Sequence, residues 1–248
     1  MHALVLVAVG IWCFLTALAG GLVGLVLGNI RLPVIVFAAS SPAAGAGANI
    51  GISGLAAATA SVAHVRAGRV DWRLVAWMAP ASVVGVVGGS AVSAALPGEA
   101  LLIVIGATLV AFGVDLLRPG RTGRRESGGE SVAAAVTSGA VIGFLGGVVG
   151  LILGALRMPA LLRFVGAEPV RAIGTNLLVG VCVGAAGLVA HTPSGVDWTL
   201  FAVGAAASIP GALLGARLTG RLDEQRLLQV VGAILVAAGT AAILQGTL

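Results

Sequence analysis

One glycine-rich phrase occurs twice in this chain and constrains its fold more than any other feature. The phrase reads GGLVGLVLGNIRLP at residues 20–33 and GGVVGLILGALRMP at residues 146–159. It places helix-breaking glycine and proline beside an arginine within a very apolar sequence. Inside a bilayer, interrupted backbone is tolerated only where it is buried in protein or lines a cavity. The phrase therefore predicts a duplicated membrane protein whose two interrupted segments face the protein interior.

The composition also places the chain in a membrane. Hydrophobic residues make up 58% of its 248 residues and charged residues only 9%, whereas about 25% of the residues of soluble domains are charged. The mean hydropathy is +1.11. Glycine contributes 39 residues, and small residues allow helices to pack closely in a bilayer. We therefore predict an all-α integral membrane protein of closely packed helices, with the lipid bilayer as its surroundings.

The charged and sulfur-containing residues exclude several other classes of protein. All 14 basic residues are arginines and the formal net charge is +5. These arginines occur singly or in short loops between apolar runs, as topology-determining charges do, so nucleic-acid binding is not expected. Cys13 and Cys182 lie in apolar stretches and lack the spacing of metal ligands, so we interpret them as packing residues. No cofactor and no metal are expected.

Eight apolar stretches are long enough to cross a bilayer core, which takes about 20 residues. They cover residues 3–28, 47–65, 72–95, 99–117, 131–154, 172–190, 197–219 and 225–245. We predict two four-helix pseudo-repeats, residues 1–117 and 131–248, joined by a polar cytoplasmic linker at 118–130. Apolar pieces at 32–40 and 158–166 are too short to cross at about 1.5 Å per residue, so half-helices or re-entrant segments are predicted there.

The first apolar stretch also has features of a signal peptide. However, no basic residue precedes its apolar run, and its repeat partner lies inside the chain. We therefore interpret it as the first membrane helix.

The duplication extends beyond the opening phrase. SPAAGAGANIG at residues 41–51 aligns with EPVRAIGTNLL at 168–178, one residue out of the earlier register. The matched positions are Pro42 with Pro169, Gly47 with Gly174, Asn49 with Asn176, the Val-Asp-Trp phrases at 70–72 and 196–198, and Gly85, Gly89, Gly106 and Gly113 with Gly211, Gly215, Gly232 and Gly239. Apolar helices that are similar by chance do not keep such positions aligned, so the halves are predicted to share a fold.

The arginines leave the relation between the two halves open. Arginines in the linker and in the loop at 66–73 place both in the cytoplasm by the positive-inside rule, and eight full crossings then put both termini there too. The same count places Arg217, Arg221 and Arg226 outside, while the loop at 191–198, which should be inside, has no arginine. Two repeats of four crossings each would have the same orientation in the membrane, so they would be parallel. The arginine-rich loops, however, change sides between the two halves, which is typical of inverted repeats.

Polar residues at the interruptions form the candidate site. Arg31 and Arg157 occupy equivalent positions, and they either extend to the membrane interface or neutralise an anion with their planar donors. Asn29, Asn49 and Asn176 are the only asparagines, and each either caps a helix or donates to a substrate oxygen. The predicted substrate-binding residues are Arg31, Asn49, Arg157, Arg171, Thr175 and Asn176. The predicted helix-break residues are Gly20, Gly21, Gly24, Gly28, Asn29, Pro33, Gly47, Gly146, Gly147, Gly150, Gly154, Pro159 and Gly174.

Helices that begin at these interruptions would favour a negatively charged ligand. Gly47 and Gly174 are predicted to start such helices, whose amino ends carry free N–H groups and partial positive charge. No acidic residue lies in the middle of a predicted span, whereas cation antiporters rely on intramembrane carboxylates. Glu168, the one acid near the second interruption, is interpreted as a partner of Arg171 or as a proton carrier. A cation substrate is disfavoured.

Two histidines end matching spans and are interpreted as interface anchors. They are His64 and His191, and Trp72 and Trp198 follow them as members of an aromatic belt. No Ser/His/Asp or Cys/His pair shares a common depth, so an enzyme is not expected.

Several phrases of the chain resemble the sulfite exporter TauE/SafE family of bacterial membrane proteins. They are the glycine-rich first helix of each half, ending in Pro33 and Pro159, together with RAIGTNLLVG at 171–180, AGRVDWRL at 67–74, SGVDWTL at 194–200 and PGALLGARLTGRLDEQRL at 210–227. The resemblance covers essentially the whole chain. It implies a permease, generally an exporter driven by an ion gradient, for sulfite, sulfonates or related small organic anions in the bacterial inner membrane.

One difference between the halves bears on the expected substrate contacts. The first half has Ala44 and Ala48 where the second has Arg171 and Thr175, so the contacts are expected to lie mainly in the second half. We predict a transporter that works by alternating access around a midplane site between the repeats. A passive anion channel and a non-transporting membrane partner protein are the alternatives. The sequence leaves open which anion is carried, the direction, a coupling proton or sodium ion, and a homo-oligomeric state.

Overall fold

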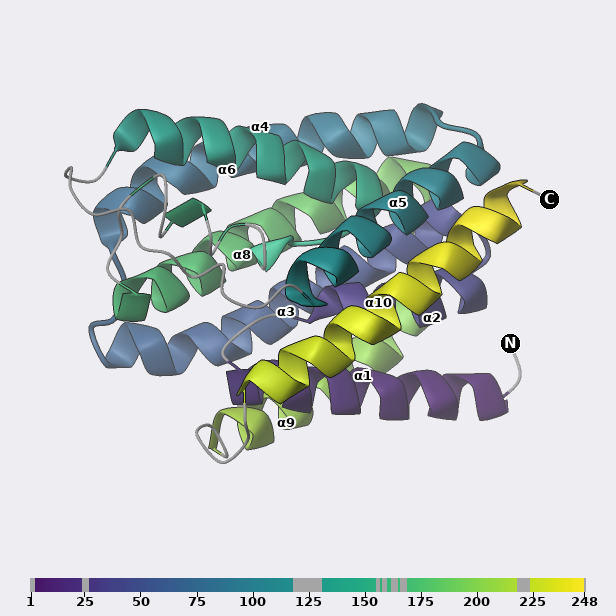
Figure 1. Cartoon of the computed structure of the whole chain (residues 1–248), viewed down its shortest axis with the longest axis horizontal. Helices are drawn as coiled ribbons and strands as arrows, with labels where there is room; N and C mark the ends of the chain where they lie inside the picture. The colour runs from purple at the N-terminus through teal and green to yellow at the C-terminus, as the bar shows by residue number, and fades with distance from the viewer. Residues whose placement is uncertain are drawn as a thin grey trace.

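The computed structural model describes residues 3–23, 27–117, 131–154, 157, 160, 161, 165, 169–217 and 224–247. These residues are helical almost throughout and include no strand (Figure 1). The helices are α1 (Ala3–Val23), α2 (Gly28–Ala38), α3 (Pro42–Arg66), α4 (Trp72–Ala95), α5 (Gly98–Leu117), α6 (Val132–Val149), α8 (Pro169–His191), the short 3-10 helix η2 (Thr192–Ser194), α9 (Trp198–Arg217) and α10 (Glu224–Thr247). The predicted all-α class is confirmed for this part of the chain.

Seven of the described helices are long and apolar enough to cross a membrane. Their apolar segments are Ala3–Gly20, Pro42–Arg66, Trp72–Ala95, Gly98–Asp115, Val132–Val149, Arg171–Ser194 and Trp198–Gly215. The eighth predicted stretch, 225–245, lies within α10, but α10 is not one of these seven. A total of eight crossings therefore stays a prediction.

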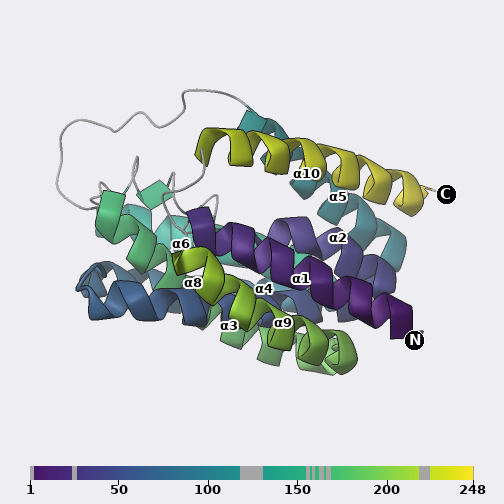
Figure 2. The same cartoon turned by 90° about the horizontal axis from the view of Figure 1, so that it is seen from below.

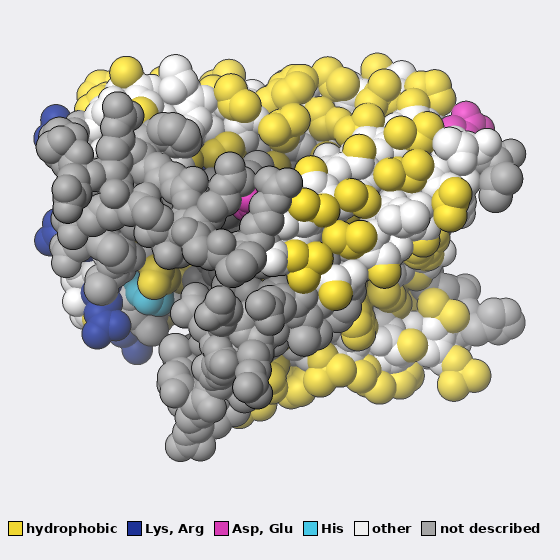
Figure 3. All heavy atoms as spheres, in the orientation of Figure 1, with side chains coloured by type: hydrophobic (Ala, Val, Ile, Leu, Met, Phe, Trp, Pro, Cys, Tyr) yellow, Lys and Arg dark blue, Asp and Glu magenta, His cyan; other side chains and the backbone are white. Residues whose placement is uncertain are grey.

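Large apolar side chains cover the outward faces of the helices, as contact with lipid requires. Leu4 is 83% exposed, Val84 74% and Val189 72%, and Figure 3 shows hydrophobic side chains over much of the face turned to the viewer. Trp72 and Trp198 are also exposed, at the first residues of α4 and α9. Both occupy helix ends, where an aromatic belt would place them.

The aspartates of the repeated Val-Asp-Trp phrases begin two equivalent helices. A carboxylate oxygen of Asp71 accepts the backbone N–H of Leu74 at 3.0 Å, and Asp197 accepts that of Leu200 at the same distance. Each carboxylate thereby satisfies one of the N–H groups that the first turn of a helix leaves unpaired. This explains why α4 and α9 start directly after these phrases.

Helix α2 is the short segment that the sequence predicts after the first span. It contains 11 residues, and at 1.5 Å per residue such a helix extends about 16 Å, half the thickness of a bilayer core. It begins at Gly28, before the predicted start at residue 32, and it is buried along nearly its whole length. Protein therefore surrounds this half-length helix, as the bilayer requires of interrupted backbone.

The interruptions are narrower than the sequence predicts. Gly20 and Gly21 lie within α1, and Gly146 and Gly147 lie within α6. Their helices continue because a glycine inside a membrane helix keeps its backbone hydrogen bonds and only removes a side chain. Of the other predicted helix-break residues, Gly24 and Pro159 lie outside the described residues.

Three further predicted breaks also lie inside helices. Pro33 lies within α2, Gly47 within α3 and Gly174 within α8. Pro42 and Pro169 begin α3 and α8 instead, because proline is favoured in the first turn, where its missing N–H would have no helical partner. The predicted helix starts at Gly47 and Gly174 are therefore wrong, and the described interruptions are Leu27 before Gly28 and the segment from Gly150 to Leu153.

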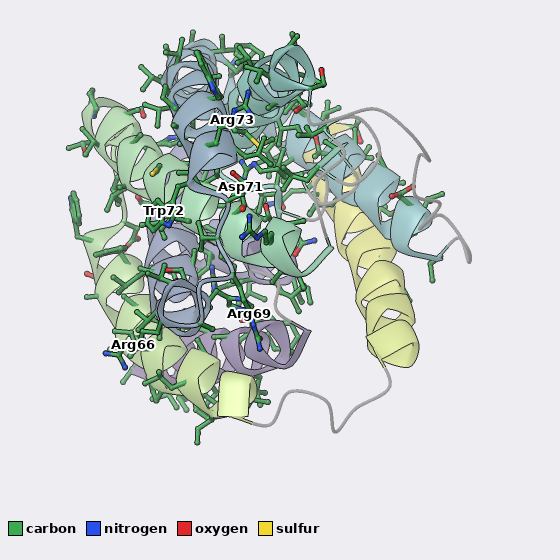
Figure 4. The ribbon with its side chains drawn as sticks, turned by 90° about the vertical axis from the view of Figure 1, so that its left-hand side faces the viewer. Arg66, Arg69, Asp71, Trp72 and Arg73 are labelled. Carbon is green, nitrogen blue, oxygen red and sulfur yellow. The ribbon has the colours of Figure 1, made fainter. Side chains whose placement is uncertain are left out.

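Figures 1 and 2 place both termini at the same end of the molecule. The loop at 66–73 lies at the opposite end, where Figure 4 shows Arg66, Arg69 and Arg73. Eight full crossings would put the termini on the same side as this loop, whereas the structure places them at the opposite end. The reason is that α2 carries the chain back toward the end where α1 began, so three helices, α1, α2 and α3, lie between the amino terminus and this loop instead of the two predicted spans.

This correction removes the conflict in the arginine pattern. Helix α9 ends with Arg217 at the end of the molecule that carries the loop at 66–73, and η2 lies at the other end. The arginine-free loop at 191–198 is therefore opposite the arginine-rich one, as the positive-inside rule requires.

Helices from the two halves of the chain are interleaved. Helix α1 packs against α9 and α6 packs against α4, while α3 packs against α8 and α5 against α10. Matching glycines allow the equivalent approaches: a Cβ on Gly85 would collide with the carbonyl oxygen of Ala140, and one on Gly211 with that of Phe14. In Figure 1, α6 runs in the direction opposite to α1, and α8 opposite to α3.

Candidate functional site

The first of the two repeated arginines is buried in the protein. Arg31 lies on α2 and is 1% exposed. Its Nε donates to Oδ1 of Asn49 at 3.1 Å and its Nη2 donates to Oγ of Ser53 at 2.6 Å. Both partners lie on α3, one helical turn apart. A Cβ on Gly28 would collide with the Ser53 hydroxyl, so the glycine at the start of α2 allows α2 and α3 to approach closely enough for these bonds.

The second repeated arginine is equally buried but has fewer partners. Arg157 is 0% exposed, and its Nη1 donates to Oδ1 of Asn176 at 3.4 Å. Nδ2 of Asn176 donates to the carbonyl oxygen of Gly154 at 3.3 Å. The Nε and Nη2 atoms of Arg157 are buried and have no hydrogen-bond partner among the described residues. The interpretation that these arginines extend to the membrane interface is therefore wrong, because burial keeps both from the surface.

The two interruptions are linked through α3 and through one apolar cluster. Nδ2 of Asn49 donates to the carbonyl oxygen of Gly150 at 2.9 Å, and a Cβ on Gly150 would lie 2.5 Å from Cα of Ala46. Apolar residues from both sides share one buried cluster, with Ile30 and Leu32 on α2 and Leu151 and Leu153 in the second interruption. Polar and apolar contacts thus join segments that are more than a hundred residues apart in the sequence.

The backbone of the second interruption is held in a conformation that most residues avoid. Gly150 ends α6 with φ of 76°, and its N–H donates to the carbonyl oxygen of Gly146 at 2.8 Å. A glycine in this left-handed conformation is a common end of a helix. Leu153 has φ of 43° and is the only described non-glycine residue with positive φ. Such strain persists only where the surrounding structure enforces it, and it often marks functional sites. Arg157 lies four residues after Leu153, and its N–H donates to the Leu153 carbonyl oxygen at 3.1 Å.

Thr175 has a structural contact at the end of the molecule that carries the arginine-rich loop. Its side chain is fully buried, and Oγ1 accepts the backbone N–H of Asp71 at 2.9 Å. In the other half, the N–H of Asp197 donates instead to the carbonyl oxygen of Ala44 at 3.3 Å, one turn before Ala48, the counterpart of Thr175. The contact of Thr175 ties α8 to the loop shown in Figure 4, which also bears Arg69.

The remaining predicted residues divide between the interior and the surface. Asn29 is buried on α2, with 8% exposed. Arg171 is exposed near the start of α8, one turn before Thr175. His191 is fully buried, with Nε2 3.0 Å from the carbonyl oxygen of Gly147, so its interpretation as an interface anchor is wrong. The interior set around the interruptions therefore contains Arg31, Asn49, Arg157 and Asn176.

Sequence reasoning missed Ser53. Its signal was its position four residues after Asn49, since residues four apart lie on the same face of a helix. The hydroxyl was indistinguishable from the other small polar residues of the chain until α2 and α3 were placed together.

The chain is similar in sequence to known membrane proteins. The family model described as "Sulfite exporter TauE/SafE" matches residues 9–242. A "Probable membrane transporter protein" of Xylella fastidiosa strain Temecula1 is 28% identical over 242 residues, covering 88% of this chain and 90% of that protein. Its counterpart in strain 9a5c is 29% identical over 243 residues, with the same coverage. The "Probable membrane transporter protein YunE" of Bacillus subtilis strain 168 is 31% identical over 111 residues, which are 43% of this chain and 39% of that protein.

No solved structure matches the chain significantly. The family model nevertheless covers nearly the whole length, including both interruptions and the helices that hold their arginines. The relatives from Xylella fastidiosa are matched over similar lengths. The chain therefore belongs to the TauE/SafE family and is a multi-pass membrane transporter.

Proposed function

We propose that this transporter moves small oxyanions, such as sulfite or organosulfonates, across the bacterial inner membrane. One observation carries the proposal. Two arginines are buried at the junction of the interruptions, and no carboxylate among the described residues forms an ion pair with either of them.

Burial makes these charges expensive. Removing an ion from water costs several kcal/mol unless a counter-charge and hydrogen bonds compensate. Asn49, Ser53 and Asn176 supply only neutral oxygens. An anionic substrate would supply the missing negative charge, and the planar guanidinium matches two oxygens of one oxyanion better than an ammonium would.

The placement of the acidic residues also favours an anion. Asp71 and Asp197 are occupied in capping α4 and α9, and Glu99 lies in the first turn of α5. A cation substrate would need carboxylates at mid-depth. Asp115, the other acidic residue within a described span, lies in the last turn of α5. This contrast supports the anion class that the family description names.

We propose alternating access between two inverted repeats as the mechanism. The opposite directions of α1 and α6, and of α3 and α8, support an inverted relation (Figure 1). Helices α3 and α8 cross where Gly54 meets Gly184, since a Cβ on Gly54 would lie 2.9 Å from Cα of Gly184. Because neither glycine has a side chain, the two helices can rotate relative to each other at this crossing, and one half can rock against the other.

The arginine-rich loop and Arg171 bear on the direction of transport. We place the loop at 66–73 in the cytoplasm, because its arginines follow the positive-inside rule. Exposed Arg171 would then attract anions on the cytoplasmic side, which suits export. A proton or sodium gradient would drive the transport, and a homo-oligomer is compatible with the lipid-facing helices.

Flux through reconstituted protein tests the proposal. Vesicles containing the purified protein should take up sulfite and methanesulfonate with saturation and with dependence on an imposed proton or sodium gradient. Arg157→Ala should abolish this flux while leaving the helical content and the monodispersity unchanged. Flux that never saturates would indicate a channel, and no flux of any anion would contradict the proposed function.

A further inference from the structure

We infer that the two buried arginines have different roles. The Nε–Nη2 edge of Arg157 binds the oxyanion, and Gly180 leaves that edge without the hydroxyl that Ser53 supplies in the first half. Arg31 is structural, because the same edge of its guanidinium is occupied. The inference rests on the proposed function, because it assigns the substrate contact within that site. It goes beyond the duplication, since equivalent residues would otherwise be expected to act alike.

The two guanidinium groups differ along one edge. In Arg31, Nε and Nη2 donate to Asn49 at 3.1 Å and Ser53 at 2.6 Å. In Arg157, Nε and Nη2 are the two buried atoms without a partner among the described residues, because Asn176 is bonded to Nη1 instead. Thus neutral protein oxygens occupy one edge, and the corresponding edge of the other arginine has two donors to offer.

A single sequence difference accounts for the missing hydroxyl. The alignment that pairs Asn49 with Asn176 and His64 with His191 pairs Ser53 with Gly180. Gly180 lies against the second interruption, since a Cβ there would be 3.1 Å from Cγ2 of Ile152. Glycine at this position supplies no oxygen for Nη2 of Arg157, whereas serine supplies one for Nη2 of Arg31.

The geometry of this edge defines the class of ligand. Nε–H and one Nη2–H of a guanidinium point in parallel, and they match two oxygens on the same carbon, sulfur or phosphorus atom. Sulfite, sulfonates and carboxylates all offer such a pair of oxygens. Chloride does not, so the site should distinguish oxyanions from halides of the same charge.

A binding experiment on the purified full-length protein tests the inference. Affinities for sulfite and methanesulfonate are measured by titration calorimetry in detergent, with chloride as the control anion. We expect Gly180→Ser to weaken oxyanion binding by at least about tenfold, because the new hydroxyl competes for a charge-assisted hydrogen bond. Gly180→Ala is the matched control: it adds the same Cβ without an oxygen, and it should bind at least about threefold more tightly than Gly180→Ser.

The outcomes separate this inference from the proposed function. Equal weakening by Gly180→Ser and Gly180→Ala would overturn the inference alone, because crowding rather than hydrogen bonding would then explain the loss. If Gly180→Ser does not give a monodisperse protein, the oxyanion affinity of Arg157→Lys tests the inference instead. It keeps the charge but lacks the paired donors, so it should weaken binding by at least about tenfold, and undiminished binding would overturn the inference. Absence of any oxyanion binding by the unmodified protein would overturn the proposed function as well.

Discussion

The side-chain amide of Asn49 donates a 2.9 Å hydrogen bond to the backbone carbonyl of Gly150, and so joins α3 to the interruption in the second half of the chain. The same side chain accepts from Nε of Arg31 at 3.1 Å. One asparagine therefore links a buried charge of the first half to the left-handed end of α6. Among the described residues, the side chain of Asn176, its partner in the alignment, bonds to Gly154 and Arg157 within its own half.

Asn49→Ala should destabilise the protein by about 2–4 kcal/mol, because a buried carbonyl and a buried charged donor would each lose a partner. Reversible unfolding in mixed detergent, followed by circular dichroism, measures the change. Thr59→Ala is the matched control, since Thr59 lies on the same helix, is only partly buried and, among the described residues, bonds with its side chain to Leu55. Its effect should stay within about 0.5 kcal/mol. Equal effects of both substitutions would contradict the bridging role of Asn49.

Gly89→Ala and Gly88→Ala should differ sharply although they are neighbours on α4. A Cβ on Gly89 would collide with the carbonyl oxygen of Phe144 on α6, whereas one on Gly88 would lie 3.8 Å from a ring carbon of Phe144. We expect Gly89→Ala to destabilise the protein by about 1–3 kcal/mol. Gly88→Ala should be neutral or stabilising by up to about 1 kcal/mol through helix propensity. Thermal denaturation of the two variants provides the comparison, and the reverse order would rule out the close α4–α6 contact.

Thr175→Val should loosen the arginine-rich loop without disturbing the rest of the fold. The change preserves the shape of the side chain but removes the acceptor for the Asp71 N–H, at a cost of about 1–2 kcal/mol. Hydrogen exchange of residues 66–73 should accelerate in Thr175→Val and stay slow in Thr175→Ser, which keeps the hydroxyl. Unaltered exchange in the valine variant would show that this bond does not hold the loop.

Single cysteines at Ala67 and Thr192, in a protein whose Cys13 and Cys182 are replaced by alanine, should be labelled from opposite sides of the membrane. Both positions are exposed: Ala67 lies in the arginine-rich loop at 66–73, and Thr192 lies in η2. A membrane-impermeant maleimide applied to intact cells should modify Thr192→Cys and leave Ala67→Cys until the cells are opened. Labelling of both from one side would contradict the arrangement of the two ends.

The sequence predicted the helical class and limited the repeated arginines to two positions, the membrane interface or the interior, for one physical reason. A charge beside helix-breaking residues in an apolar chain has few tolerated places, so Arg31 and Arg157 were constrained before any packing was known. The sequence left the side of each terminus open, because it depends on whether α2 carries the chain back across the bilayer, which its length alone does not decide. The partners of the arginines depend on how α2 and α3 pack, so Ser53 was missed.

Gly47 and Gly174 illustrate another limit. Their place beside polar residues suggested helix starts, yet both serve close packing inside helices: a Cβ on Gly47 would lie 2.9 Å from Cβ of His191, and one on Gly174 would lie 3.2 Å from Cβ of His64. A glycine that admits a neighbouring helix and a glycine that ends a helix look the same in one sequence. Only the three-dimensional arrangement separates the two uses.

The most direct test of the account is the position of a bound oxyanion. Selenite has the shape and charge of sulfite and carries a strong anomalous scatterer, so crystals of the protein grown with selenite locate it by anomalous diffraction. The account predicts a selenium peak within about 4 Å of Nε and Nη2 of Arg157, the separation that two N–H···O bonds to one oxyanion impose. A peak beside Arg31 alone, or the absence of any peak at the junction of the interruptions, would contradict it.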